Sequence, residues 1–368
     1  MKRYHYRYPV VVLAVWVVWL SGCGPARLPF DEHVPAQVLT YIGAPPVYDA
    51  RPRFRSIFCE LLDRSRQRLN LSVGCDEWLW RLDDEPQTPA EQIKLPEHDP
   101  RLHILMVPGA FSDCLGEMGK SYREGAERLG QLGYTIRNVK INSLSSSTGN
   151  ASIIAEAVAK ETLAPSERLA LLGYSKGTTD ILHFLVAYPQ LAFRVSAVLS
   201  VSGAVNGSPL ADRYSEAEYD NWIVGLFPGK CRPGDRGVLD SLSRTRQFQW
   251  LATHPLPTHV RYFSLGTFAR YADMQMFQRA TYKLLEKIHP LNDGQLLFMD
   301  QIIPGSGLLG YVNADHWTVA VPVEDKFSNR DAALKERNHK LRSLLFEAMV
   351  LFLTENLNSA QQVAPGLD

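Results

Sequence analysis

The sequence predicts an α/β protein in which a mostly parallel sheet is covered by helices on both faces. From residue 101 onward, short apolar runs alternate with segments whose apolar residues recur at the three- and four-residue spacing of amphipathic helices. Strands that alternate with helices are joined by crossover connections, which make neighbouring strands parallel. The chain has 368 residues, 45% of them hydrophobic and 21% charged, so it can bury a large core. We therefore expect one such domain over residues 101–360.

The expected strands are apolar runs of strand length, and turn-forming residues close several of them. They lie at 102–107, 134–141, 169–172, 195–201 and 259–265. The expected helices lie at 57–69, 115–129, 153–163, 181–186 and 331–357. Residues 213–258 interrupt the alternation and have no clean period, but they contain several aromatic residues: Tyr214, Tyr219, Trp222, Phe227 and Trp250. We interpret this insertion as a lid or cap over the sheet edge.

The first 22 residues have the features of a secretory signal. A basic segment precedes an apolar run, Tyr8–Leu20, that is shorter than the roughly 20 residues of a membrane-spanning helix. The run ends at Leu20-Ser-Gly-Cys23, which resembles the lipobox of bacterial lipoproteins. The resemblance implies that residues 1–22 are removed and that a lipid on Cys23 anchors the protein in the cell envelope. Gly24 would favour the outer membrane of a Gram-negative cell, and the alternative is an uncleaved anchor with a coincidental cysteine.

Residues 23–100 are expected to form a tether and an N-terminal extension, because 24–50 are rich in proline and 83–100 are acidic. Four cysteines remain beyond Cys23, namely Cys59, Cys75, Cys114 and Cys231. In an oxidising compartment they can form two disulfides in three ways, or they can stay as buried thiols. They include no CxxC pair, so no zinc site is expected. With 39 basic and 39 acidic residues and no basic patch, the sequence does not indicate a nucleic-acid partner.

The strongest chemical signal is Gly173-Tyr-Ser175-Lys-Gly177, which follows an apolar strand and precedes an amphipathic helix. This strand–turn–helix context is typical of a nucleophile elbow, in which a sharp turn displays the serine at the sheet edge. We therefore expect Ser175 to be a nucleophile and the backbone N–H of Lys176 to face a developing oxyanion. The Lys176 side chain is expected in solvent, and the alternative is that it anchors a nearby carboxylate.

A nucleophilic serine needs a base and an acid that orients the base, in the chain order Ser, Asp or Glu, His. His316 lies in a loop before the last helix and is the expected base. Asp293, in an Asn-Asp-Gly turn, is the expected acid; Asp300 is the alternative, and Asp315 adjoins the base too closely to face its ring. The second oxyanion donor is expected in the loop Val107-Pro-Gly-Ala-Phe, at the N–H of Ala110 with that of Phe111 as the alternative.

From about residue 101 to 322 the chain resembles bacterial lipases and esterases of the α/β-hydrolase superfamily. The resemblance rests on five patterns in order: PGAF at Pro108, GYSKG at Gly173, GAVNGSPLAD at Gly203, NDG at Asp293 and DHW at His316. It implies the α/β-hydrolase fold, a Ser175–His316–Asp293 triad, an acyl-enzyme intermediate, no metal or cofactor, and a carboxylic-ester substrate. The aromatic residues of the 213–258 insertion predict an apolar binding face, and hence a hydrophobic acyl chain or polyester. The chain departs from such lipases at the oxyanion loop, where Pro replaces the usual His before Gly109.

Other functions are compatible with these motifs. Thioesterases, acyltransferases and polyester depolymerases use the same triad, so the sequence alone does not separate them. The alternative outside the enzymes is a non-catalytic envelope lipoprotein that uses a degenerate hydrolase fold for binding. Such a protein is expected to lack a triad residue, and none is missing here.

Overall fold

The computed structural model describes residues 46–87, 94–214, 218, 231–232, 234–323 and 332–362. In these residues eight strands form one sheet. The strands are β1 (Tyr48–Asp49), β2 (Leu79–Trp80), β3 (Leu102–Val107), β4 (Ile136–Asn138), β5 (Arg168–Tyr174), β6 (Val195–Val201), β7 (Arg261–Thr267) and β8 (Gly307–Val312). Their order is β1-β8-β7-β6-β5-β3-β4, and β2 also pairs with β8. Every pairing is parallel except that of β2. The predicted fold class, an α/β-hydrolase fold with a mostly parallel sheet, is confirmed.

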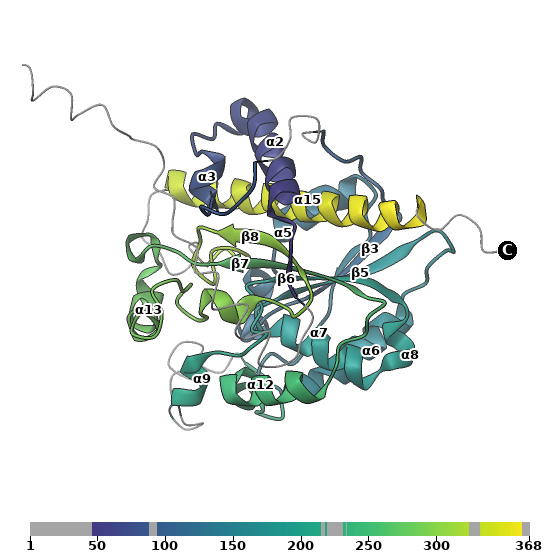
Figure 1. Ribbon diagram of the computed structural model, residues 1–368, viewed down its shortest axis with the longest axis vertical. Coiled ribbons are helices and arrows are strands. Elements are labelled where there is room, and N and C mark those ends of the chain that lie inside the picture. The colour runs from purple at the N-terminus through teal and green to yellow at the C-terminus, as the bar shows by residue number, and fades with distance from the viewer. Residues whose placement is uncertain are drawn as a thin grey trace, which may run out of the picture.

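Helices cover both faces of the sheet (Figure 1). One face carries α2 (Arg51–Leu69), α5 (Arg123–Gln131) and α15 (Ala332–Gln362). The other carries α6 (Ser147–Lys160), α7 (Lys176–Ala187), α8 (Pro189–Ala192) and α12 (Arg244–Thr253). Shorter helices are α3 (Cys75–Trp78), α4 (Ser112–Leu115), α9 (Pro209–Arg213), α11 (Val238–Leu242) and α13 (Arg279–Glu286). No helix among the described residues combines the length and apolar character that crossing a membrane requires.

The core has two layers because the sheet is buried on both faces. Alternate β5 residues point to opposite sides: Ala170 and Leu172 join the cluster under α2 and α15, whereas Leu169 and Leu171 join the one under α6 and α7. This arrangement explains why β5 is a continuous apolar run rather than an alternating one.

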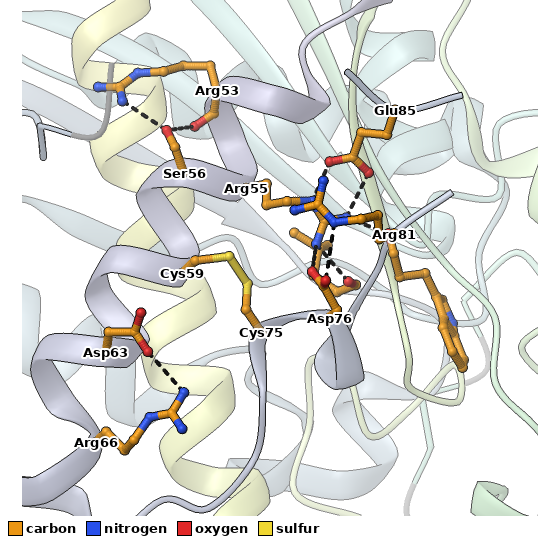
Figure 2. Close-up of a disulfide and its surroundings, with 12 residues drawn as sticks. Arg53, Arg55, Ser56, Cys59, Asp63, Arg66, Cys75, Asp76, Arg81 and Glu85 are labelled. Atoms are coloured by element: carbon orange, nitrogen blue, oxygen red, sulfur yellow. Dashed lines mark hydrogen bonds and ion pairs between the residues drawn. A yellow bond between two sulfur atoms is a disulfide. The ribbon is translucent and has the colours of Figure 1, made fainter. Parts of the chain in front are cut away.

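Residues 46–82 add two short strands to the sheet and one long helix to its cover. β1 and β2 share the outer edge of β8, where β1 pairs with Gly307 and Leu308 and β2 pairs with Tyr311 and Val312. Between them, α2 packs on α15, and the rings of Phe54 and Phe352 meet edge to face at 5.9 Å. Figure 2 shows the disulfide Cys59–Cys75, which joins α2 to the start of α3. The segment therefore completes one side of the hydrolase core.

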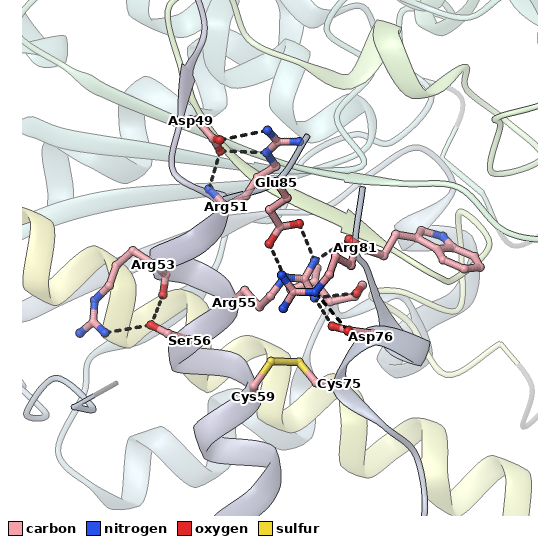
Figure 3. A network of polar contacts seen from close by, with 12 residues as sticks. Asp49, Arg51, Arg53, Arg55, Ser56, Cys59, Cys75, Asp76, Arg81 and Glu85 are labelled. Atoms are coloured by element: carbon pink, nitrogen blue, oxygen red, sulfur yellow. Dashed lines mark hydrogen bonds and ion pairs between the residues drawn. A yellow bond between two sulfur atoms is a disulfide. The ribbon is translucent and has the colours of Figure 1, made fainter. Parts of the chain in front are cut away.

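A buried arginine holds this segment in place. The Arg55 side chain is 3% exposed, and its guanidinium contacts the Glu85 carboxylate with two nitrogens, one of them at 2.7 Å (Figure 3). It also contacts Asp76 at 2.8 Å and donates to the carbonyls of Leu79 and Trp80. A buried guanidinium is tolerated when its donors are satisfied in this way. Arg55 thus joins α2, α3 and β2 into one unit.

Several element boundaries differ from the sequence predictions. The helix expected over 115–129 is broken into α4, a 3₁₀ turn at Gly116–Gly119, and α5. Gly116 has a φ of 59°, a left-handed conformation that does not continue a helix. The strand expected over 134–141 pairs only at Ile136–Asn138.

Part of the 213–258 insertion lies outside the described residues, including Tyr219, Trp222 and Phe227. The described part forms α11 and α12, which contact α9, and α11 also contacts α7. The Trp250 ring of α12 lies between His183 at 4.0 Å and His254 at 4.8 Å, nearly parallel to both. This aromatic residue therefore packs on α7, in the helical layer.

Candidate active site

The carboxyl ends of the parallel strands lie at one edge of the sheet, and the expected site residues lie at this edge. Ser175 follows β5 directly, with φ 54° and ψ −128°, before α7 begins. A left-handed φ is rare for serine and costs of the order of 1–3 kcal/mol. The glycines of the motif allow the turn: a Cβ on Gly177 would lie 2.1 Å from the Val107 carbonyl oxygen. The local geometry is that of a nucleophile elbow.

Ser175, His316 and Asp293 form a continuous hydrogen-bonded chain. His316 Nε2 lies 2.8 Å from Ser175 Oγ, and its Nδ1 lies 2.8 Å from Asp293 Oδ2. All three residues are buried, at 8%, 5% and 0% exposed respectively. With Nδ1–H donated to the carboxylate, Nε2 is left as the acceptor for the serine hydroxyl. The structure thus brings together the three residues that the sequence singled out.

Asp293 is fixed on all sides. Its Oδ1 accepts from the backbone N–H of Gln295 at 2.9 Å and of Leu296 at 2.7 Å. Its Oδ2 accepts from the Thr267 hydroxyl at 2.8 Å, besides facing His316. These donors stabilise the charged carboxylate and aim it at the imidazole.

The competing acids have other partners. Asp300 faces Arg244, whose Nε lies 3.1 and 3.0 Å from its two oxygens. Burial raises the pKa of Asp300 to about 6, while Arg244 opposes the shift. Asp315 accepts from the backbone N–H groups of Trp317 and Thr318 and from Gln278, so its carboxylate anchors its own loop. Neither carboxylate is bonded to His316.

The expected oxyanion donors lie beside the nucleophile. Lys176 is the first residue of α7, so its N–H has no partner within the helix and lies at the positive end of the helix dipole. Ala110 follows Gly109, on which an added Cβ would lie 2.9 Å from the Ser175 Cβ. Only glycine permits this close approach of the Ala110 loop to the serine.

The Lys176 side chain is not in solvent, and this corrects the sequence prediction. It is 0% exposed, and its Nζ lies 2.6 Å from Oδ1 of Asp180, which is also 0% exposed. Asp180 further accepts from the Ser147 hydroxyl at 2.6 Å and from Asn150 Nδ2 at 2.7 Å. The side chain thus anchors a nearby carboxylate, which was the alternative: Asp180 lies one helical turn away in α7. Both are buried because α6 packs on α7.

The second disulfide joins the oxyanion loop to the insertion. Cys114 in α4 is bonded to Cys231, 117 residues later. With Cys59–Cys75, it resolves the pairing that the sequence left open. Nearby, the Phe111 and Trp317 rings stack at 6.3 Å, and Phe277 meets Trp317 edge to face at 6.1 Å. Aromatic surface therefore adjoins both Ala110 and His316.

Sequence reasoning missed several supporting residues. Thr267 and Gln301 both contact the Asp293 carboxylate, and the Tyr174 hydroxyl donates to the His316 carbonyl at 2.7 Å. Thr267 ends β7, so its place at the carboxyl end of a strand was the available signal. Among the described residues no group of three or more His, Cys, Asp or Glu could hold a metal ion. Cys23 lies outside the described residues.

Solved structures of ester-cleaving enzymes are similar to this chain. A metagenomic carboxyl esterase is 34% identical, with 88% of this chain and 99% of the esterase aligned and a TM-score of 0.74. A Bacillus licheniformis lipase in its mature form is 20% identical over 61% of this chain and 88% of the lipase, with a TM-score of 0.46. EstA from Clostridium botulinum is 13% identical over 85% of this chain and 97% of EstA, with a TM-score of 0.44. No protein-family model and no curated protein matches the sequence.

Proposed function

Since the chain belongs to the carboxyl esterases and lipases of the α/β-hydrolase family, we propose that this ester hydrolase works through an acyl-enzyme formed on Ser175. The observation that carries the proposal is the hydrogen-bonded chain from Ser175 through His316 to Asp293, with both distances at 2.8 Å. A serine is activated when a base is within reach and a third group orients that base. Here a single buried network supplies both.

The reaction proceeds in two acyl transfers. His316 Nε2 takes the Ser175 proton as Oγ bonds to the substrate carbonyl carbon, and the backbone N–H groups of Lys176 and Ala110 donate to the resulting oxyanion. The imidazolium, stabilised by Asp293, returns its proton to the departing alkoxide, which leaves as an alcohol. Water then loses a proton to His316 as it attacks the acyl-enzyme carbonyl. The imidazolium returns that proton to Ser175 Oγ as the acyl–oxygen bond breaks, which releases the carboxylic acid and regenerates the serine.

The substrate we infer is an ester with an apolar acyl group. Phe111 and Trp317 each adjoin a residue of the proposed machinery, and both side chains are 7% exposed. Their stacked rings make the packing around the nucleophile apolar, which favours an apolar acyl group. A panel of p-nitrophenyl esters from acetate to palmitate, with one thioester, would measure this preference. A preference for acetate would contradict it.

Labelling with a fluorophosphonate probe tests the nucleophile. We expect the wild-type chain to be labelled and Ser175→Ala and His316→Ala to be unlabelled, because the probe reports an activated serine. His259→Ala is the matched control, since His259 stacks on the exposed Phe193 before β7 begins. Labelling that survives Ser175→Ala, or a folded wild type that neither labels nor cleaves any ester, would overturn the assignment.

We also propose that a lipid on Cys23 anchors the enzyme in a bacterial cell envelope, the outer membrane being favoured by Gly24. The proposal is supported by the Leu20-Ser-Gly-Cys23 motif after a basic segment and a short apolar run. The full chain should partition into the detergent phase of Triton X-114, and a chain that begins at Gly24 should partition into the aqueous phase. Equal partitioning of the two, or a mature N-terminus other than Cys23, would refute the anchor.

A further inference from the structure

A cavity of about 680 Å³ lies at the opposite edge of the sheet from Ser175. It opens at the amino ends of β7 and β8, between residues 254–258 and 304–305, and Tyr48 of β1 and Asn356 of α15 complete its wall. Because β5, β7 and β8 are parallel, their amino ends lie away from the edge that holds the nucleophile. The cavity is therefore separate from the proposed catalytic site.

The walls of the cavity are mainly apolar. They are formed by Leu251, Leu256, Val260, Phe263, Pro255 and Pro257. Its volume lies within the roughly 300–1,000 Å³ of small-molecule sites, which have apolar linings and a few polar groups. An aliphatic chain matches such a wall, because burying it against these side chains removes apolar surface from water.

The charge of the lining has one sign. Arg261 is the permanently charged residue of the lining, and no Asp or Glu is among the described residues that line the cavity. Arg261 donates through Nη1 to the Asn356 carbonyl, a neutral partner that leaves its charge uncompensated at that contact.

Neighbouring arginines reinforce this positive charge. Arg168, at the start of β5, donates to Asn358 Oδ1 at 3.1 Å, and its Nη2 is buried without a hydrogen-bond partner among the described residues. Burial, and then the charge of Arg101, lower the pKa of Arg168; the charge of Asp99 opposes this shift, and that of Arg261 adds to it. An anion at this edge of the sheet would relieve that repulsion.

We propose that this cavity is a second, non-catalytic site that binds a long-chain carboxylate. The carboxylate meets the Arg261 guanidinium, and the aliphatic chain lies along the wall formed by Leu251 and Leu256. A neutral chain would leave the guanidinium unmatched, and a small anion would leave the apolar wall in water. The combination selects an amphipathic monoanion. The proposal does not require Ser175 to be the nucleophile.

Calorimetric titration with sodium decanoate tests the site. The protein is the chain from Gly24 onward, which lacks the signal segment and the lipid so that no detergent competes, and it carries Ser175→Ala so that no acyl-enzyme forms. We expect one decanoate per chain, and decan-1-ol should bind about tenfold more weakly because it has no charge for Arg261. Equal affinity for the alcohol would overturn the proposal.

Substitutions locate the binding. Arg261→Gln should weaken decanoate binding about tenfold, Arg261→Lys should keep most of it, and Leu256→Trp should weaken it by narrowing the cavity beside the proposed aliphatic chain. Arg64→Gln is the matched control, because Arg64 lies on α2, pairs with Glu60 at 2.6 Å and does not line the cavity. Near-ultraviolet circular dichroism checks that each variant is folded. Unchanged binding in Leu256→Trp would place the ligand elsewhere.

A covalent block separates this site from the catalytic one. In a chain that keeps Ser175, saturation with a fluorophosphonate should leave decanoate affinity unchanged. Loss of binding after the block would assign the ligand to the catalytic site and overturn the proposal. If the chain neither labels nor cleaves esters but still binds decanoate through Arg261, the proposed function fails while this inference stands.

Discussion

Breaking the buried ion pair beneath the nucleophile elbow should cost more stability than any exposed pair. In Lys176→Met the Asp180 carboxylate loses its one charged contact among the described residues, at 2.6 Å, while both side chains are 0% exposed. It keeps the neutral donors Ser147 and Asn150, which offset part of the loss. Removing one partner of a buried pair typically costs about 3–5 kcal/mol. We expect a decrease of about that size in the free energy of unfolding, which a domain stable by roughly 5–15 kcal/mol can survive.

Urea unfolding followed by tryptophan fluorescence measures this decrease. The double variant Lys176→Met/Asp180→Asn should recover about 2 kcal/mol, because the amide removes the stranded charge and still accepts from Ser147. Lys160→Met is the matched control, since Lys160 and Glu156 also lie one turn apart on a helix but are 76% and 73% exposed. A loss in Lys176→Met no larger than in Lys160→Met, or no recovery in the double variant, would refute the reasoning.

Three further outcomes follow from the site and its surroundings. Asp293→Asn should lower kcat by about 10³–10⁴-fold with little change in KM, because the amide favours the wrong imidazole tautomer. Steady-state kinetics on a p-nitrophenyl ester measure this, and a decrease in kcat of less than tenfold would contradict the role of Asp293. Burial, and then the charges of Lys176 and His254, lower the pKa of His183 to about 4. The unfolded chain therefore binds a proton that the native state does not, and stability should fall by up to about 3 kcal/mol as pH drops from 6.5 to 4. His183→Phe keeps the stack on Trp250 and should flatten this part of the pH–stability curve; an unchanged curve would contradict it. Cys114→Ser should lower the free energy of unfolding by roughly 2–5 kcal/mol, because its disulfide closes a loop of 117 residues; an unchanged urea midpoint would count against that.

The sequence predicts best where the signal is local. The β5 strand, the elbow and the helix after it are adjacent in the chain, so one apolar run, two glycines and one amphipathic pattern indicate all three. His316 and Asp293 were found because chain order and turn chemistry restrict them to a few candidates. Their hydrogen-bonded arrangement depends on the loops that follow β7 and β8 meeting at one edge of the sheet. The sequence pattern implies this meeting but does not specify its geometry.

The missed elements depend on contacts between distant segments. β8 contains Gly307 and Gly310, which weaken its strand signal, and Gly310 has a φ of 129°. β1 and β2 have two residues each and exist because β8 offers an edge to pair with. The burial of Lys176 depends on α6 lying over α7, although its four-residue spacing from Asp180 was visible in the sequence. The disulfide pairing could not be predicted either, because it depends on which distant segments the fold brings together.

The packing of α2 on α15 has a consequence for the order of folding. Arg53 pairs with Glu355 at 2.7 Å, and Lys340 donates to the Leu69 carbonyl, so the first and last described helices stabilise each other across nearly the whole chain (Figure 1). Contacts of such long sequence separation form late, because the loop-closure entropy of the intervening chain must be overcome first. This face of the sheet therefore lacks the part of its helical cover that α15 provides until the C-terminal helix has been synthesised. The apolar core residues that pack under α15 remain exposed until then.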